Sequence, residues 1–74
     1  MKLYFQHSNG ELELVKGDVS ISDHDFQAVS EALADLEVRA PHFHSYYQRV
    51  WKDGDGVWWI DVGDHYCFYV VVSD

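Results

Sequence analysis

One helical segment interrupts a sequence that otherwise alternates as β-strands do, and this contrast limits the possible folds. Apolar residues recur there at the spacing of one helix face: Phe26, Val29, Ala32, Leu33 and Leu36. Pro41 prevents the helix from continuing, because proline disfavours helical backbone at the residue before it. We therefore predict one helix from Asp23 to Arg39, with Glu31 and Asp35 one turn apart on its other face.

The start of this helix has its own signals. Ser22 is a good N-cap residue, and Asp25 three residues later gives the pattern of a capping box. Ile21 before the cap and Phe26 four residues after it match a hydrophobic staple. Both patterns predict that the first helical turn begins directly after Ser22.

The residues before the helix predict a β-hairpin. Residues 2–6 and residues 11–16 each alternate between two faces, and Asn9-Gly10 between them is a strong turn signal. In the second strand we expect Leu12 and Leu14 to point inward. Glu11 and Glu13 then point to solvent.

Three further strand-like segments follow Pro41, at residues 45–52, 57–62 and 65–72. Turns separate them, the first at Asp53-Gly54-Asp55-Gly56 and the second at Gly63-Asp64. The last segment is apolar on both faces, which is typical of a central strand. The sequence thus predicts a single compact domain, residues 1–74, of the α+β class. Its order is ββαβββ, a mostly antiparallel sheet with one helix packed on one face.

One face of this sheet is left without a cover. If Trp58, Ile60 and Val62 point to the helix, Trp59 and Asp61 point away from it. We expect further residues to share that face: Tyr4, Glu11, Glu13, Tyr47, Arg49, Trp51 and Val57. Aromatic rings edged by carboxylates are typical of a protein contact, although they also stabilise sheets as cross-strand pairs.

The charge of the chain is the next informative feature. Thirteen carboxylates against five Lys and Arg give a formal charge of −8. Such a protein is repelled by nucleic acid and by anionic membranes, so neither is a predicted partner. The charge favours a basic protein partner, while solubility alone is the competing explanation.

Targeting signals are absent from the sequence. The single cysteine, Cys67, allows no internal disulfide, and the apolar residues after Met1 are too few for a signal peptide. The longest apolar run, residues 67–72, is too short to span a bilayer. We therefore expect a cytoplasmic protein.

Histidines offer a metal alternative. His42 and His44 share one side of an extended segment, and His65, Cys67 or Asp64 could supply a third ligand. The spacing matches no zinc signature, however, and histidines in turns are common without a metal. We predict no metal and no cofactor.

Catalytic patterns are equally weak. The position of Cys67 near His65 favours a thiol packed in the core over a nucleophile with its base. Asp53-Gly54-Asp55-Gly56 lacks the remaining ligands of a calcium loop. Asp61 and Asp64 are a candidate pair of catalytic carboxylates, but a domain this small has little room for a substrate pocket. We predict a binding protein and not an enzyme.

The charge leads to a specific functional hypothesis. Proteins that bind duplex DNA line their grooves with Lys and Arg, and a compact acidic fold can occupy such a groove. The residues that we expect to bind the partner are Trp59 and eight carboxylates: Glu11, Glu13, Glu31, Asp35, Asp53, Asp55, Asp61 and Asp64.

In size, charge and compactness the chain resembles the small acidic inhibitors of phages and mobile elements, including anti-CRISPR and anti-restriction proteins. That resemblance implies as partner the basic groove of a Cas effector, a restriction enzyme or a nuclease, in the host cytoplasm. Three alternatives remain: an antitoxin that plugs a ribonuclease active site, a homodimeric regulatory domain pairing through Trp51 and Trp59, and a small metal enzyme built on His42, His44 and His65. The sequence leaves open whether the protein is a monomer or a homodimer.

Overall fold

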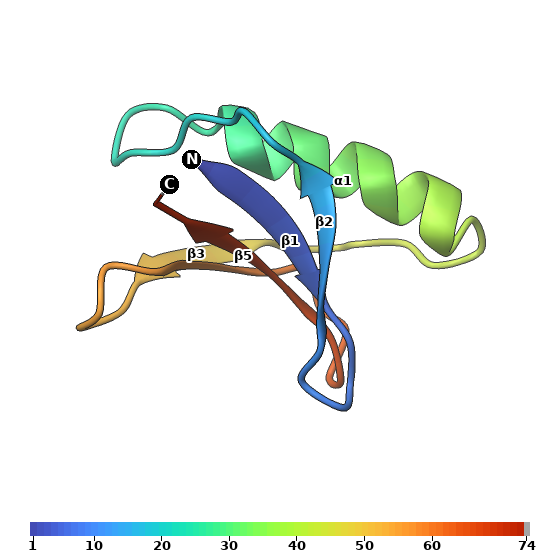
Figure 1. Cartoon of the computed structure of the whole chain (residues 1–74). Coiled ribbons are helices and arrows are strands. Elements are labelled where there is room, and N and C mark those ends of the chain that lie inside the picture. Colours follow the sequence, from blue (N-terminus) through green and yellow to red (C-terminus); the bar gives the residue numbers. More distant parts are fainter. Residues whose placement is uncertain (74) are drawn as a thin grey trace.

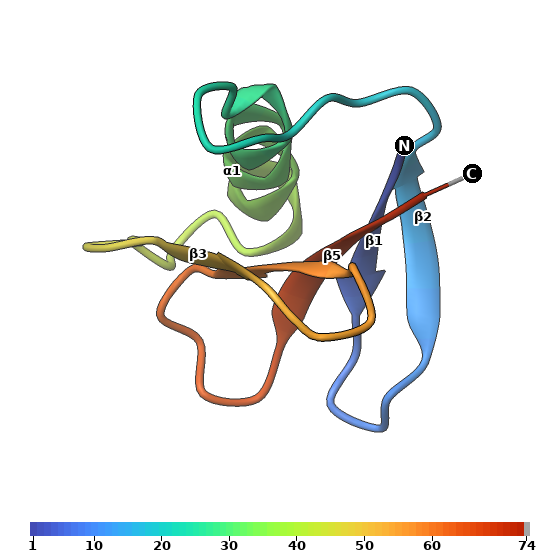
Figure 2. The ribbon, with the colours of Figure 1, turned by 90° about the vertical axis from the view of Figure 1, so that its left-hand side faces the viewer.

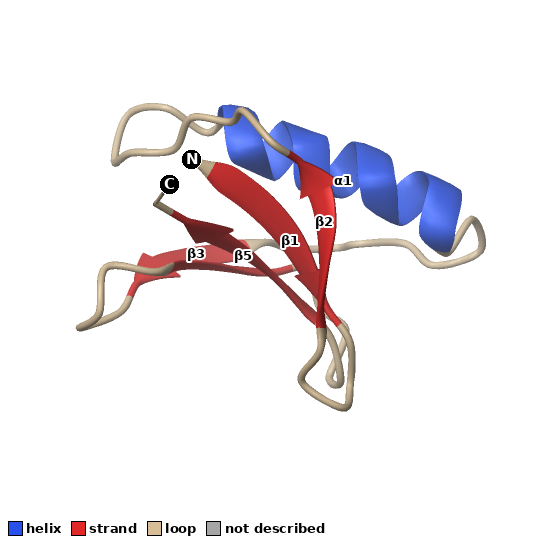
Figure 3. Ribbon diagram, viewed as in Figure 1, coloured by secondary structure: helices blue, strands red, loops and turns tan. Residues whose placement is uncertain are grey.

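The computed structural model describes residues 1–73 and consists of one antiparallel sheet with one helix on one face (Figures 1 and 3). Its elements follow the predicted order: β1 (Lys2–Gln6), β2 (Leu12–Lys16), α1 (Gln27–Arg39), β3 (Arg49–Lys52), β4 (Trp58–Asp61) and β5 (Phe68–Val72). The predicted α+β class and ββαβββ order are confirmed. Each strand lies within the segment expected for it, and α1 ends at Arg39, before Pro41.

The strands lie in the order β2-β1-β5-β4-β3, and all neighbouring pairs are antiparallel. β5 is the central strand, as its apolar composition predicted, and its residues Tyr69, Val70 and Val71 are buried. The sheet is twisted, so that the β3–β4 hairpin crosses the direction of β1 and β2 (Figure 2). Within the described residues, helix α1 and the loop before it cover one face, and no other helix covers the second, which we call the open face.

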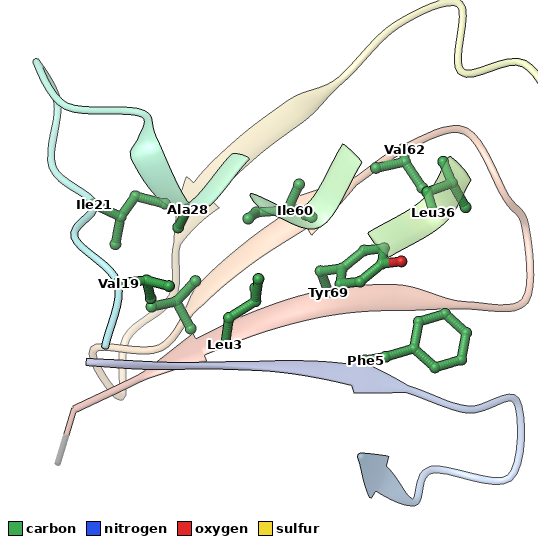
Figure 4. Close-up of a cluster of buried hydrophobic side chains, with 11 residues drawn as sticks. Leu3, Phe5, Val19, Ile21, Ala28, Leu36, Ile60, Val62 and Tyr69 are labelled. Carbon is green, nitrogen blue, oxygen red and sulfur yellow. The ribbon is translucent and has the colours of Figure 1, made fainter. Parts of the chain in front are cut away.

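The core lies between the sheet and α1 (Figure 4). The sheet side contributes Leu3, Phe5, Ile60, Val62, Tyr69 and Val71, and the helix contributes Ala28, Ala32 and Leu36. Because two of the three helical residues are alanines, the helix backbone can approach the sheet closely. Val19 and Ile21, in the loop before the helix, close the end of this core.

The predicted start of the helix is wrong by one turn. Ser22 and Asp25 exchange two backbone hydrogen bonds and form a tight turn of their own, and α1 begins only at Gln27. The Asp25 carboxylate accepts a hydrogen bond from the Gln27 backbone N–H instead of completing a capping box. Phe26 is 52% exposed, so the predicted staple with Ile21 does not form.

The predicted orientation of β2 is also wrong. Leu12 and Leu14 are exposed on the open face, because Leu14 pairs with Tyr4 and Glu13 pairs with Phe5. Glu13 therefore lies on the helix side of this edge strand. The register also shifts between Leu3 and Tyr4, which marks an irregularity of the β-bulge type.

Helix α1 has 13 residues. Among residues 1–73, no helix is long and apolar enough to cross a membrane.

Candidate partner-binding surfaces

The open face of the sheet carries a continuous row of apolar side chains, one from each strand. The row follows the strand pairing and consists of Leu14, Tyr4, Val70, Trp59 and Trp51. Its two ends are the most exposed, since Leu14 is 55% and Trp51 is 39% exposed, whereas Val70 in the middle is buried. We call these five residues the apolar row.

Aromatic rings pack closely at one end of this row. Trp51 and Trp59 are stacked, with ring centroids 6.3 Å apart, and Phe68 meets both rings edge-on. The Arg49 guanidinium lies 5.6 Å from the Trp51 ring centroid. Among the residues expected on the open face, the register confirms the placement of Tyr4, Arg49, Trp51 and Trp59. Glu13, which was expected there too, lies on the other face.

Several of the carboxylates expected to bind a partner already have a cation beside them. Arg39 on α1 makes hydrogen bonds to Glu13 on β2 and to Asp35 one helical turn earlier, at distances of 3.0 to 3.4 Å. Its guanidinium also stacks on the Phe5 ring, 4.1 Å from the centroid. This cluster joins the helix to the edge of the sheet. Arg39 also neutralises negative charge of Glu13 and Asp35 that would otherwise attract a partner.

The electrostatics of this cluster follow from its hydrogen bonds. Those from Arg39, and then from His7, lower the pKa of Glu13 to about 2. The same bonds to Glu13 and Asp35 raise the pKa of Arg39 above its usual value. The Tyr69 hydroxyl donates a hydrogen bond to Asp35, and burial, followed by this contact, raises the pKa of Tyr69.

Two more predicted residues are in ion pairs. Lys16 Nζ lies 3.1 Å from Glu31 Oε1, which joins β2 to the helix. Arg49 donates two hydrogen bonds to Asp61 Oδ2, and the other oxygen of Asp61 accepts from the backbone N–H of Gly63. The Asp61 side chain is only 8% exposed, so this carboxylate holds the end of β4 in place.

Asp53 organises the β3–β4 turn. Its Oδ1 accepts hydrogen bonds from the backbone N–H groups of Asp55 and Val57, and its Oδ2 accepts one from the Trp59 indole. These bonds, the indole contact first, lower the pKa of Asp53. The hydrogen bond from the Trp59 indole to Asp53 joins the β3–β4 turn to the open face. The spacing of residues in the sequence does not reveal this bond.

The remaining predicted carboxylates lie at separate turns. Glu11 is in the β1–β2 turn, Asp55 in the β3–β4 turn and Asp64 in the β4–β5 turn. Asp64 accepts a hydrogen bond from the backbone N–H of Tyr66, and within residues 1–73 no Lys or Arg forms an ion pair with any of the three. The structure therefore does not gather the nine predicted residues into one surface.

Charge is nevertheless segregated in the molecule. Four of the five Lys and Arg residues lie in strands, whereas ten of the twelve carboxylates within residues 1–73 lie outside them. Six of those carboxylates belong to α1 and its flanking residues, where Arg39 is the only Lys or Arg: Asp18, Asp23, Asp25, Glu31, Asp35 and Glu37. We call residues 17–40 the acidic layer, and this layer lies on one side of the sheet (Figures 1 and 2).

Sequence reasoning found only part of the acidic layer. Glu31 and Asp35 were predicted to bind a partner, but Asp18, Asp23, Asp25 and Glu37 were not. These four are exposed, and no ion pair involves them in the described part of the chain. The signal that could have identified them is the run of six carboxylates and one arginine across residues 17–40.

The residues of the metal alternative are not gathered into a site within residues 1–73. Among residues 1–73, no three His, Cys, Asp or Glu side chains are placed to hold a metal ion. Burial, and then the nearby Asp64, raises the pKa of Cys67, which keeps the thiol in its protonated, less nucleophilic form. Asp61 and Asp64 line an open hollow of about 490 Å³, but the Asp61 carboxylate is already bound to Arg49.

No protein-family model matches this chain, and neither a curated protein nor a solved structure does. The residues and their geometry therefore carry the functional argument alone.

Proposed function

We propose that this protein is a small acidic binding protein that inhibits a nucleic-acid-binding complex, by presenting its acidic layer to the cationic groove of that complex. The observation that carries the proposal is the charge of residues 17–40, where six carboxylates accompany one arginine. The partner is a protein or ribonucleoprotein with a groove lined by Lys and Arg, as in a Cas effector, a restriction enzyme or a nuclease.

The density of charge in the acidic layer can be compared with that of DNA. A 13-residue helix is about 20 Å long. One strand of a DNA duplex carries about six phosphates over that length, since its charges are about 3.4 Å apart along the axis. Over this length the helix itself carries three carboxylates, and the segment before it, residues 17–26, adds three more. The acidic layer therefore has a lower charge density than one DNA strand, with charge of the same sign.

Not all of these carboxylates contribute equally. Glu31 is paired with Lys16, and Asp35 is paired with Arg39. These cations weaken the electrostatic attraction of the two carboxylates for a partner. Within residues 1–73, Asp18, Asp23, Asp25 and Glu37 form no ion pair with Lys or Arg, so they supply most of the attraction. Opposite charge accelerates the encounter of two proteins and sets its dependence on salt.

The experiment that tests this function uses competition with DNA. The immobilised chain is incubated with a lysate of its source cells, and bound protein is eluted with short duplex DNA or with salt of the same ionic strength. The proposal expects that the DNA releases a nucleic-acid-binding protein which the salt leaves bound, and that the purified chain then displaces DNA from that protein. Capture of a protein that binds DNA and the chain simultaneously would contradict the proposal.

A further inference from the structure

The open face of the sheet is a second surface, and it is chemically unlike the acidic layer. We propose that this face binds the same face of a second copy of the chain, so that the protein is a homodimer whose two acidic layers lie on opposite outer sides. This inference does not depend on the proposed function, because it rests on the apolar row and on the charges of the strands.

The apolar row is the first argument. It runs across all five strands without a charged residue, from Leu14 through Tyr4, Val70 and Trp59 to Trp51. Leu12, which pairs with Gln6 on the same face, is a further exposed apolar side chain at 50%, and Tyr47, at 48%, lines an open hollow with Arg49 and Phe68. Apolar patches of this extent on small proteins mark interaction sites, because their contact with water is unfavourable.

The charge of the open face selects the occupant. Its strand residues include Lys2 and Arg49, and its one strand carboxylate, Asp61, is buried against Arg49. A strongly basic partner therefore finds little attraction there, and nucleic acid is repelled by the overall charge of −8. A second copy offers an open face that is itself apolar and nearly neutral, although it carries the same overall charge.

The position of the acidic layer supports the same occupant. This layer lies on the helix side of the sheet (Figure 2), so two copies that meet by their open faces keep their acidic layers apart. The repulsion between two chains of charge −8 is then weakest in this arrangement. Salt screens what remains over about 10 Å at 0.1 M ionic strength.

The row is also suited to two-fold symmetry. A two-fold axis parallel to β5 would place Leu14 of one copy over Trp51 of the other, because β2 and β3 are the two edge strands. The same operation brings Glu11, next to Leu12, close to Arg49 of the second copy. The Arg49 side chain is 68% exposed, so it can meet a carboxylate from outside.

The size of the face is sufficient. The molecule measures 31 × 26 × 21 Å, so one face offers on the order of 600–800 Å². Each partner of a standard protein–protein interface buries about 800 Å², which is close to this value.

The experiment measures the mass of the purified chain in solution by sedimentation velocity over a range of concentrations, at physiological and at high salt. We expect a species of twice the 8.6 kDa chain mass that persists at high salt, because apolar contacts are not screened. Leu14→Glu should raise the dissociation constant of the dimer by at least about tenfold, since it places a charge in the apolar row.

Val38→Glu is the matched control, because Val38 is an apolar helix residue that is 84% exposed and the substitution changes the charge equally. It should leave the dissociation constant unchanged. Circular dichroism verifies that both variants fold, and Leu12→Glu replaces Leu14→Glu if the latter does not.

A wild-type chain that is monomeric at all concentrations would overturn the inference. A folded Leu14→Glu or Leu12→Glu variant that dimerises as tightly as wild type would do so too, and so would a Val38→Glu variant that dissociates. None of these results involves the DNA-binding partner, so they leave the proposed function untouched.

Discussion

The Tyr69 hydroxyl donates a 2.6 Å hydrogen bond to Oδ2 of Asp35, and this contact joins the central strand to the helix across the core. Tyr69 is fully buried, so its hydroxyl needs a partner inside the protein. Asp35 receives this bond together with those of Arg39, and it is therefore a structural carboxylate as much as a surface one. A residue selected from the sequence for its charge thus has a role in the fold.

This relationship predicts the effect of removing one oxygen atom. Tyr69→Phe should lower the free energy of unfolding by about 1–2 kcal/mol, because hydrogen bonds to charged groups are stronger than average while Asp35 keeps Arg39. Urea denaturation measures the change. Tyr46→Phe is the control, since Tyr46 is 90% exposed, and it should alter the stability by less than about 0.5 kcal/mol. Equal effects of the two substitutions would show that the buried hydroxyl contributes nothing.

The low pKa of Glu13 predicts a dependence of stability on pH. The hydrogen bonds from Arg39 and His7 lower the pKa of Glu13 in the folded state to about 2 from its ordinary value of 4.5, so the unfolded chain binds the proton more readily. The contribution of Glu13 is therefore complete above pH about 4.5 and is lost as the pH falls towards 2. Glu13→Gln should flatten the decline of unfolding free energy in this range, as measured by denaturation at several pH values. A decline as steep as that of wild type would refute the assignment.

Asp53 and Asp55 are neighbours in one turn with different roles. Asp53 accepts two backbone hydrogen bonds and one from the Trp59 indole, whereas no side-chain contact of Asp55 is found among residues 1–73. Asp53→Ala should lower the denaturation midpoint and change the tryptophan fluorescence, because Trp59 loses its acceptor. Asp55→Ala removes the same charge and should change neither. A loss of stability in both variants would indicate a general charge effect in place of these bonds.

Alternation and turn signals were enough to predict most of this fold. Asn9-Gly10 and Asp53-Gly54-Asp55-Gly56 identified two hairpins, and Pro41 identified the end of the helix. These signals are local, since each turn is determined by the residues within it. The central position of β5 also followed from its composition, because a strand whose residues are buried on both faces, as Tyr69, Val70 and Val71 are, has few polar side chains.

The errors had two causes, a contact from a distant residue at β2 and competing local backbone hydrogen bonds at the helix start. The alternation in β2 did not specify which face is buried. In the structure, Arg39 on the helix donates hydrogen bonds to Glu13 on the helix side of β2, and the leucines lie on the open face. At the helix start, Ser22 and Asp25 satisfied each other's backbone groups, so the cap signals did not start a helix. The ion pairs of the candidate surface were missed because, as in β2, they depend on distant residues. Which carboxylates are neutralised depends on cations that are far away in the sequence.

The most direct test of the proposed function compares two variants of equal charge. In one, Asp18→Asn, Asp23→Asn and Glu37→Gln remove three unpaired carboxylates from the acidic layer. In the other, Glu11→Gln, Asp55→Asn and Asp64→Asn remove three from the turns of the sheet. The measurement is the concentration of each variant that displaces duplex DNA from the captured nucleic-acid-binding protein. The account predicts that the acidic-layer variant needs at least about a tenfold higher concentration than wild type, while the turn variant stays close to wild type. Equal displacement by the two variants would contradict the claim that residues 17–40 form the binding surface.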